Sequence, residues 1–344
     1  MPDAATLPYA WYSEQEALRN ELARIFGRSW QYVAHADEVA RPGDYVARTA
    51  GHVPVVVVRD EESALSGYVN VCRHRGHEVA SGAGNRRTLQ CGYHAWTYGL
   101  DGALRSAPRS DREDDFDRDA ISLLPVRVAT FGPLVFVNPD EHAAPLDDVL
   151  GDLPDHLAAA GVDLSALRFR RRIPYEAEAN WKVVIENYLE CYHCPVAHPA
   201  FTKVVDVDPD AYTLEASEWF SSQTGPARNA AGEVADGNFF WIWPNTRLNV
   251  FPGRPNLSVG AAVPAGPGRT RGFFDYFFGE DVPDDWAAEL IAFDDQVGRE
   301  DRALVESVQR GVSSGLLSEG RLLLASEHLI AHFHALVRRA LGQA

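Results

Sequence analysis

The chain has 344 residues, of which 46% are hydrophobic and 24% are charged, and its formal net charge is −17. This length suits about two domains or one large one, and an acidic surface excludes nucleic acid and anionic membranes as partners. No apolar run approaches the ~20 residues of a membrane span, and the first residues lack a basic start and an apolar leader. We therefore expect a cytoplasmic enzyme whose four cysteines are reduced, metal-bound or buried rather than a disulfide framework.

The first third of the chain changes from a helical to a β-rich pattern. Residues 13–29 have apolar residues at helical spacing, with Ser13 as a candidate N-cap and Glu16 three residues later. From residue 30 to about 140, short runs rich in Val, Thr and aromatic residues are separated by Gly, Pro, Asn and Asp. This pattern predicts a small all-β domain.

The rest of the chain mixes helical and strand patterns. A short helix, a strand and a second helix are expected before Pro195, and alternating strands follow between about 237 and 280. A long acidic helix is expected from Pro283 to about 310, and an amphipathic helix over 318–342. Because strands and helices are segregated, we predict an α+β architecture for this part.

Two short motifs inside the β-rich region combine cysteine with histidine. "CRHRG" (72–76) and "CGYHAW" (91–96) give Cys-x-His, 16 residues, then Cys-x2-His. A zinc finger usually places its two cysteines together and its two histidines together, and an all-cysteine iron–sulfur cluster needs four cysteines. One cysteine and one histidine in each arm is what a Rieske [2Fe–2S] cluster requires. The predicted ligands are Cys72, His74, Cys91 and His94.

A second metal motif lies in "ENYLECYHCPVAHPAF" (186–201). His193 and His198 are five residues apart and would diverge on one continuous helix, but Pro195 allows His193 to close the helix and His198 to come from the following loop. Two histidines and a carboxylate with open positions are typical of non-haem Fe(II) oxygenases. Spacing alone does not choose the carboxylate among the acids of the late helix, which are Asp294, Asp295, Glu300, Asp301 and Glu306.

Three further residues surround the first of these histidines. Glu190 precedes His193 by three residues, so it is either a partner of that imidazole or an ordinary surface carboxylate. Cys191 and Cys194 form Cys-x2-Cys around His193, a spacing also found in redox pairs and zinc sites. We interpret this pair instead as small apolar filler.

The two motifs together, in this order, resemble the catalytic α subunit of the Rieske non-haem iron oxygenases. The resemblance covers nearly the whole chain and rests on CRHRG, CGYHAWTYGLDG, NWKVVIENYLECYHCPVAHPAF and EDRALVESVQRG. It implies a Rieske domain over 30–145, and a helix-grip catalytic domain formed by 1–29 and 146–344. It also implies that His193, His198 and Asp301 bind the mononuclear iron.

The resemblance further implies an electron path and an assembly. Glu190 would link a Rieske histidine, His94, to His193 across a subunit boundary, and a head-to-tail homotrimer would bring the two groups together. A separate reductase of flavin or ferredoxin type would pass electrons from NAD(P)H to the cluster, and the iron would activate O2 beside the substrate. No dinucleotide-binding motif is present in the sequence, which agrees with a separate reductase.

The prediction of the substrate class depends on the stretch "FFWIWPNTRLNVFPG" (239–253). It resembles the branch of the family that acts on choline, betaines and carnitine, and an aromatic cage for a quaternary ammonium group is expected from cation–π contact. The candidate cage residues are Phe240, Trp241, Trp243 and Phe251. We therefore predict oxidation of a small amine or betaine by hydroxylation or demethylation. The alternatives are hydroxylation or N-oxygenation of an aromatic or heterocyclic compound, and an electron carrier that uses only its Rieske cluster.

Overall fold

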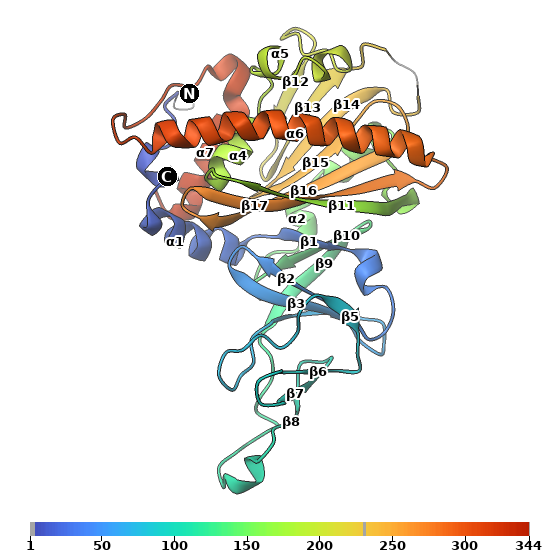
Figure 1. Ribbon diagram of the computed structural model, residues 1–344, viewed down its shortest axis with the longest axis vertical. Helices are drawn as coiled ribbons and strands as arrows, with labels where there is room; N and C mark the ends of the chain where they lie inside the picture. The colour runs from blue at the N-terminus through green and yellow to red at the C-terminus, as the bar shows by residue number, and fades with distance from the viewer. Residues whose placement is uncertain (1–3, 230–231, 344) are drawn as a thin grey trace. The chain divides into compact units, whose positions relative to one another are not determined.

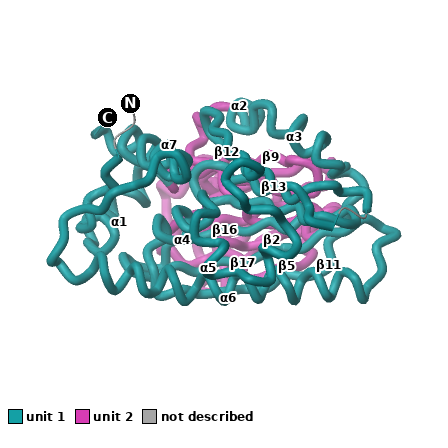
Figure 2. Tube along the Cα trace, turned by 90° about the horizontal axis from the view of Figure 1, so that it is seen from above, with its two compact units in different colours: residues 1–25, 145–344 teal, residues 26–144 magenta. Residues whose placement is uncertain are grey.

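The computed structural model describes residues 4–229 and 232–343, and the chain divides into two compact units (Figure 2). Unit 1 consists of Met1–Ile25 and Pro145–Ala344, and unit 2 of Phe26–Ala144. The mixture of helices with antiparallel sheets confirms the predicted α+β class. Among the described residues, no helix is both long and apolar enough to cross a membrane.

Unit 2 is built from two antiparallel sheets. The larger has the order β1-β10-β9-β4-β3-β2-β5 and the smaller the order β6-β7-β8. Strand β3 carries four consecutive valines, Val55 to Val58, that are all buried, because β-branched side chains fill both faces of a covered strand. The strands are β1 (Gln31–His35), β2 (Asp44–Ala50), β3 (Val53–Arg59), β4 (Leu65–Val69), β5 (Ala83–Asn85), β6 (Thr88–Gln90), β7 (Thr97–Gly99), β8 (Leu104–Ser106), β9 (Pro125–Phe131) and β10 (Leu134–Asn138).

Unit 1 contains one seven-stranded antiparallel sheet in the order β11-β17-β16-β15-β14-β13-β12. The long strand β17 pairs with β11, the first strand of the unit, on one side and with β16 on the other. The strands are β11 (Leu167–Ala177), β12 (Thr213–Ala216), β13 (Phe220–Pro226), β14 (Asp236–Ile242), β15 (Thr246–Val250), β16 (Asn256–Gly266) and β17 (Arg269–Gly279).

The long helix α6 crosses one face of this sheet (Figure 1). Ala287 and Ile291 of α6 pack against Tyr276 and Phe278 of β17, which fixes the helix on the sheet. The helices of unit 1 are α1 (Gln15–Arg24), α2 (Leu146–Leu150), α3 (Leu153–Ala159), α4 (Trp181–Tyr188), α5 (Cys194–Ala197), α6 (Asp284–Val312) and α7 (Leu324–Leu341).

Helix α4 leads into the second metal motif and is anchored at its start. The side chain of Asn180 accepts a hydrogen bond from the backbone N–H of Lys182, which caps the helix. The ammonium group of Lys182 is fully buried and donates to Glu21 of α1 at 2.5 Å, and the indole N–H of Trp181 donates to the same carboxylate at 2.7 Å. Removal of one partner of a buried ion pair strongly destabilises the fold, because the other charge is left buried and unpaired. The pair between Glu21 and Lys182 therefore holds α1 against the start of α4.

Candidate metal sites and active-site cavity

The two Cys–His motifs of unit 2 form loops of the same shape. In each, the cysteine N–H donates to the carbonyl five residues later, and the cysteine carbonyl accepts from the N–H four residues later. The fourth residue after the cysteine has a positive φ in both loops, 76° at Gly76 and 59° at Ala95. Gly76 takes this conformation without a steric cost, whereas Ala95 is in the left-handed region that disfavours a Cβ.

The four predicted cluster ligands of these loops separate into two pairs. Cys72 and Cys91 are buried with their thiols as neighbours, while His74 and His94 are exposed with ring centroids 4.6 Å apart. Among the residues that the structure describes, no three of these four donor atoms lie within 4.8 Å of one another. A single tetrahedral zinc needs all four donors around one point. Two thiols and two imidazoles in separate pairs instead fit a cluster with two irons, one held by each pair.

The two exposed imidazoles stack on aromatic rings. His74 stacks on Trp96 with centroids 5.0 Å apart, and His94 on Tyr93 at 3.8 Å. Within the described part of the chain, neither imidazole hydrogen-bonds to a carboxylate. The outer side of this histidine pair is therefore open to solvent.

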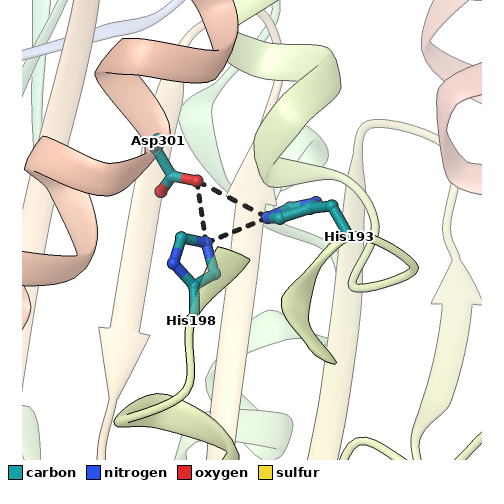
Figure 3. A group of neighbouring side chains, drawn as sticks. All are labelled: His193, His198 and Asp301. Carbon is teal, nitrogen blue, oxygen red and sulfur yellow. Dashed lines mark hydrogen bonds and ion pairs between the residues drawn. The ribbon is translucent and has the colours of Figure 1, made fainter. Parts of the chain in front are cut away.

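The second motif converges on one point (Figure 3). The Nε2 atoms of His193 and His198 are 3.1 Å apart, and the Oδ1 atom of Asp301 lies 3.5 Å from the first and 2.9 Å from the second. Over residues 4–229 and 232–343, this is the one group of three or more His, Cys, Asp or Glu donors that all lie within 4.8 Å of one another. Two imidazole nitrogens and a carboxylate oxygen this close together can hold one metal ion between them. The donor set matches the 2-His-1-carboxylate face of Fe(II) oxygenases.

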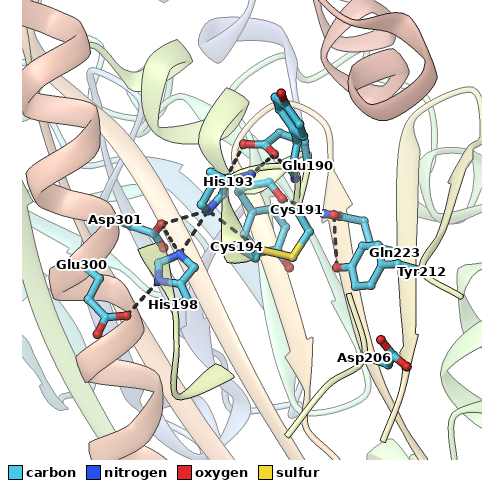
Figure 4. The surroundings of a disulfide bond; sticks show 12 residues. Glu190, Cys191, His193, Cys194, His198, Asp206, Tyr212, Gln223, Glu300 and Asp301 are labelled. Carbon is cyan, nitrogen blue, oxygen red and sulfur yellow. Dashed lines mark hydrogen bonds and ion pairs between the residues drawn. A yellow bond between two sulfur atoms is a disulfide. The ribbon is translucent and has the colours of Figure 1, made fainter. Parts of the chain in front are cut away.

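A carboxylate lies behind each of the two histidines (Figure 4). Glu190 Oε1 accepts from Nδ1 of His193, and Glu300 Oε2 lies 2.8 Å from Nδ1 of His198. Because carboxylates only accept, each Nδ1 carries the proton and each Nε2 points toward Asp301. Burial alone would lower the pKa of His193, but the bonds to Asp301 and Glu190 raise it to about 9. Asp301 is buried too, yet the two imidazoles lower its pKa to about 2.

The backbone around the two histidines differs from the expectation that His193 closes the preceding helix and His198 lies in the loop after it. Helix α4 ends at Tyr188, and His193 and His198 instead flank the four-residue helix α5. Glu190 follows the end of α4, and its Oε2 accepts from the backbone N–H groups of Tyr192 and His193. Its carboxylate therefore fixes both the local turn and the orientation of His193.

The expectation that Cys191 and Cys194 are reduced filler is wrong. The two residues form a disulfide across His193, with their Cα atoms 5.0 Å apart (Figure 4). The other two cysteines of the chain, Cys72 and Cys91, are free and buried as expected. The disulfide therefore closes the short turn from Cys191 to Cys194 that contains His193.

The other acids of the late helix serve different partners. Glu300 lies behind His198, as described above, and Asp295, which also lines the cavity described below, pairs with Arg299. Asp294 accepts from the hydroxyls of Tyr276 and Ser258, and Glu306 from the backbone N–H of Glu178.

A cavity opens onto the His193, His198 and Asp301 group. Its wall includes Phe201, Phe239 and Phe251, which follow one another from His198 with ring centroids 6.5, 5.6 and 5.6 Å apart. Strand β15 contributes Arg247 and Asn249 on the same face as Phe239. The cavity is therefore apolar near the three donors and contains a few polar groups elsewhere, as small-molecule sites usually do.

The structure differs from the expected aromatic cage at three of its four positions. Phe251 lines the cavity, but Phe240, Trp241 and Trp243 are not among its lining residues. Phe240 pairs with Leu248 on the opposite face of β14, because side chains alternate along a strand. Trp241 and Trp243 lie further along and pack against Phe333 of α7, with centroids 5.5 and 6.2 Å away.

Sequence reasoning missed several cavity residues. Phe201 and Phe239 lie at the ends of the stretches 186–201 and 239–253 but were not predicted to line the site, and Glu300 was predicted as a possible metal ligand rather than as a partner of a histidine. Arg247 was missed as well, although an arginine within "NTRLNV" is an unusual residue for a buried strand. This arginine in a buried strand pattern was the one feature of the local sequence that could have indicated a residue of the cavity.

Two family models match the chain. The model of the Rieske [2Fe-2S] domain matches residues 29–131, and the model of the ring hydroxylating alpha subunit (catalytic domain) matches residues 164–236 and 207–343. Together they span both units. The second match extends over most of unit 1, which excludes a chain with a Rieske domain alone.

The relatives and solved structures cover the chain almost completely. The carnitine monooxygenase oxygenase subunit of Acinetobacter pittii is 39% identical over 98% of this chain and 95% of its own length. The chloroplastic choline monooxygenase of Atriplex hortensis is 31% identical over 98% of this chain and 78% of its own length. A solved quaternary ammonium Rieske monooxygenase, described in terms of carnitine oxidation by gut microbiota and inter-subunit electron transfer, is 36% identical with a TM-score of 0.88 and covers 98% and 96% of the two chains.

Proposed function

The chain belongs to the Rieske non-haem iron oxygenases, and from this premise we propose that it oxidises a small substrate carrying a quaternary ammonium group. The observation that carries the proposal is the aromatic wall of Phe201, Phe239 and Phe251 beside the His193, His198 and Asp301 group. A quaternary ammonium ion offers no hydrogen-bond donor, so aromatic faces are its natural partners. The named activities of the carnitine and choline monooxygenase relatives support the same substrate class.

The chain uses a Rieske [2Fe–2S] cluster and a mononuclear iron, as its two domain matches indicate. Cys72, Cys91, His74 and His94 would hold the cluster, and His193, His198 and Asp301 would hold the mononuclear iron. When bound, these groups supply the electrons and the activation of O2.

The residues of the chain would position the reacting parts. Glu190 and Glu300 hold the Nδ1–H groups of the two histidines and so keep both Nε2 atoms aimed at the same point. The phenylalanine wall would keep the ammonium end of the substrate beside that point and exclude water from it. Substrate orientation is therefore assigned to aromatic packing rather than to hydrogen bonds at this end.

The assembly is part of the proposal. His74 and His94 have no carboxylate partner among the described residues, whereas Glu190 lies beside the exposed residues Tyr192 and Val196. Exposed apolar residues beside a functional carboxylate are typical of a docking surface. We infer that His94 of a neighbouring copy approaches Glu190 in a head-to-tail homotrimer, and that a separate reductase feeds electrons from NAD(P)H to the cluster.

The experiment that tests the substrate class is O2 consumption by the reconstituted enzyme with a surrogate reductase. Trimethylammonium compounds are compared with neutral isosteres in which a tert-butyl group replaces the ammonium group. We expect the cations to support product-forming O2 consumption and the isosteres to have at least about tenfold lower kcat/KM, since a desolvated cation–π contact is worth ~2 kcal/mol. Equal use of both series, or preference for aromatic acids, would contradict the proposed class.

A further inference from the structure

A buried guanidinium group in the wall of the cavity forms no hydrogen bond to a carboxylate among the described residues. Arg247 of β15 is 8% exposed, and its Nη2 donates to the hydroxyl of Tyr175 at 2.5 Å. Its Nε–H is buried and has no hydrogen-bond partner. Within the described residues, no carboxylate forms an ion pair with this side chain.

Aromatic rings hold the guanidinium in place. Its central carbon lies 4.7 Å from the ring centroid of Phe274, 5.5 Å from that of Tyr175 and 5.6 Å from that of Tyr188. Stacking on flat rings fixes the plane of the guanidinium and leaves its edge available for a ligand. The group is thus immobile before any ligand arrives.

Another arginine of the same sheet shows what a structural arginine looks like here. Arg172 of β11 donates from Nε and Nη2 to the two oxygens of buried Asp275, at 2.6 and 2.5 Å. Arg247 has the same fork, but no carboxylate of the described residues lies within ion-pair distance of it, and the charge of Asp294 acts on it only at longer range. The carboxylate of Asp294 on α6 instead accepts hydrogen bonds from the hydroxyls of Tyr276 and Ser258.

An unpaired buried charge with an unsatisfied donor is costly, and such groups are usually paired or serve a ligand. Arg247 lines the same cavity as the His193, His198 and Asp301 group. The ring of Phe274 contacts the guanidinium, whereas the ring of Phe201 contacts His198. One end of the cavity therefore suits a cation held by rings, and another part suits an anion held by a guanidinium.

We propose that Arg247 binds the carboxylate of a zwitterionic substrate, so that the enzyme acts on trimethylammonium carboxylates in preference to trimethylammonium alcohols. The inference rests on the proposed function, because it assigns the second end of a substrate whose ammonium end was assigned above. A planar guanidinium with a free Nε–H matches the two oxygens of a carboxylate, whereas a hydroxyl offers one acceptor and no charge.

The first arm of the test uses the unaltered holoenzyme and changes only the substrate. γ-Butyrobetaine, its methyl ester and choline are compared by O2 consumption with product analysis, and by equilibrium binding to the anaerobic enzyme. We expect the acid to exceed its ester and choline by about 10- to 100-fold in kcat/KM and in affinity, the range of a hydrogen bond to a charged group. Equal kcat/KM and affinity for acid and ester would overturn the role of Arg247.

The second arm changes the protein. Arg247→Gln should lose this preference, mainly through a higher KM for the acid, while the ester keeps its lower kcat/KM, and Arg247→Lys should recover part of the preference. Arg269→Gln, which removes an exposed guanidinium from the same sheet, is the matched control and should keep it. Iron content and cluster absorption establish that each variant is loaded. Equal losses for acid and ester in a loaded Arg247→Gln enzyme would overturn the inference.

The two proposals fail in different ways. If the unaltered enzyme oxidises choline and the ester as well as the acid, the assignment of Arg247 is wrong and the quaternary ammonium class stands. If no ammonium compound supports O2 consumption by the loaded enzyme, the proposed function is wrong and the carboxylate assignment falls with it.

Discussion

The two metal motifs differ in where their parts come from and in how each histidine is held. The cluster loops of unit 2 take all four donors from a stretch of 23 residues, and their imidazoles are exposed without a carboxylate partner. The group in unit 1 takes His193 and His198 from one turn and Asp301 from α6, more than 100 residues later. Both of its histidines have a carboxylate behind them.

This contrast separates two kinds of site. The loops form a local unit whose histidines face outward, as an electron entrance or exit requires. The second group depends on the packing of α6 over the sheet, so its geometry is a property of the whole unit. A change in one site should therefore leave the other loaded, and the following predictions test that independence.

The largest effect is expected from Asp301→Ala. It removes the one carboxylate of the three-donor group and leaves two imidazoles facing each other, so the mononuclear iron should be lost and substrate oxidation should fall to background. Metal analysis should drop from about three to about two irons per chain, while the visible spectrum of the cluster is unchanged.

Cys72→Ser is the matched change in the other motif. It should remove the cluster and two irons but leave about one iron per chain in unit 1. Loss of all iron in either variant would show that the sites depend on each other. Two irons per chain in the unaltered protein would refute the mononuclear site.

A smaller effect is expected from Glu190→Gln. The amide oxygen still accepts from Nδ1 of His193, so both sites should stay loaded, but the negative charge that would link neighbouring copies is lost. Turnover should fall by roughly 100-fold, at the upper end of effects from groups that orient a metal ligand. Single-turnover product yield is the decisive measurement, and a normal yield with pre-reduced enzyme would refute the bridge.

Glu300→Ala should act more weakly. The carboxylate behind His198 is removed, so the imidazole loses its orientation and iron affinity should fall about tenfold, the lower end for such partners. Turnover should recover when excess Fe(II) is added, which is not expected for Glu190→Gln. If Fe(II) titration gives the same affinity as in the unaltered protein, Glu300 does not hold His198.

The same contrast explains how much the sequence predicted. The cluster loops were predicted residue by residue because spacing, glycines and ligand types lie within one short stretch. The carboxylate that joins His193 and His198 could not be predicted in this way, because five acids of the late helix were equivalent by spacing. Only the resemblance to the family favoured Asp301. That Asp301 faces Nε2 of His198 while Glu300 faces its Nδ1 depends on how α6 packs over the sheet, which is a tertiary feature.

The aromatic residues illustrate the limit further. Alternation predicts that only one face of "FFWIW" meets the cavity, but the register that selects Phe239 is set by pairing with β15. Trp241 shares that face and still misses the cavity, because the strand continues beneath α7. Neither fact is written in the local sequence.

The smallest effect concerns a buried acid that has no counterpart in the cluster loops. Burial raises the pKa of Asp294 to about 6, although hydrogen bonds from Tyr276 and Ser258 oppose the shift. Because this pKa lies above its unfolded value of 3.8, the folded state keeps its proton longer, and stability falls as pH rises from about 4 to about 6. Above about pH 6 the free energy of unfolding has lost its full contribution from this group, which is at most about 3 kcal/mol.

Asp294→Asn removes that ionisation while its Oδ1 still accepts from one of the two hydroxyls. The variant should therefore gain stability relative to the unaltered protein at about pH 7.5 but not at about pH 4.5, where Asp294 is protonated. Each kcal/mol corresponds to a shift of about 2–4 °C in Tm for a unit of this size. Tryptophan fluorescence would follow mainly unit 1, which holds six of the eight tryptophans, and visible absorption would follow the cluster of unit 2. Because the charge lies in unit 1 alone, only the first signal should change its pH dependence, and parallel pH profiles for the two proteins would show that folding does not raise the pKa of Asp294.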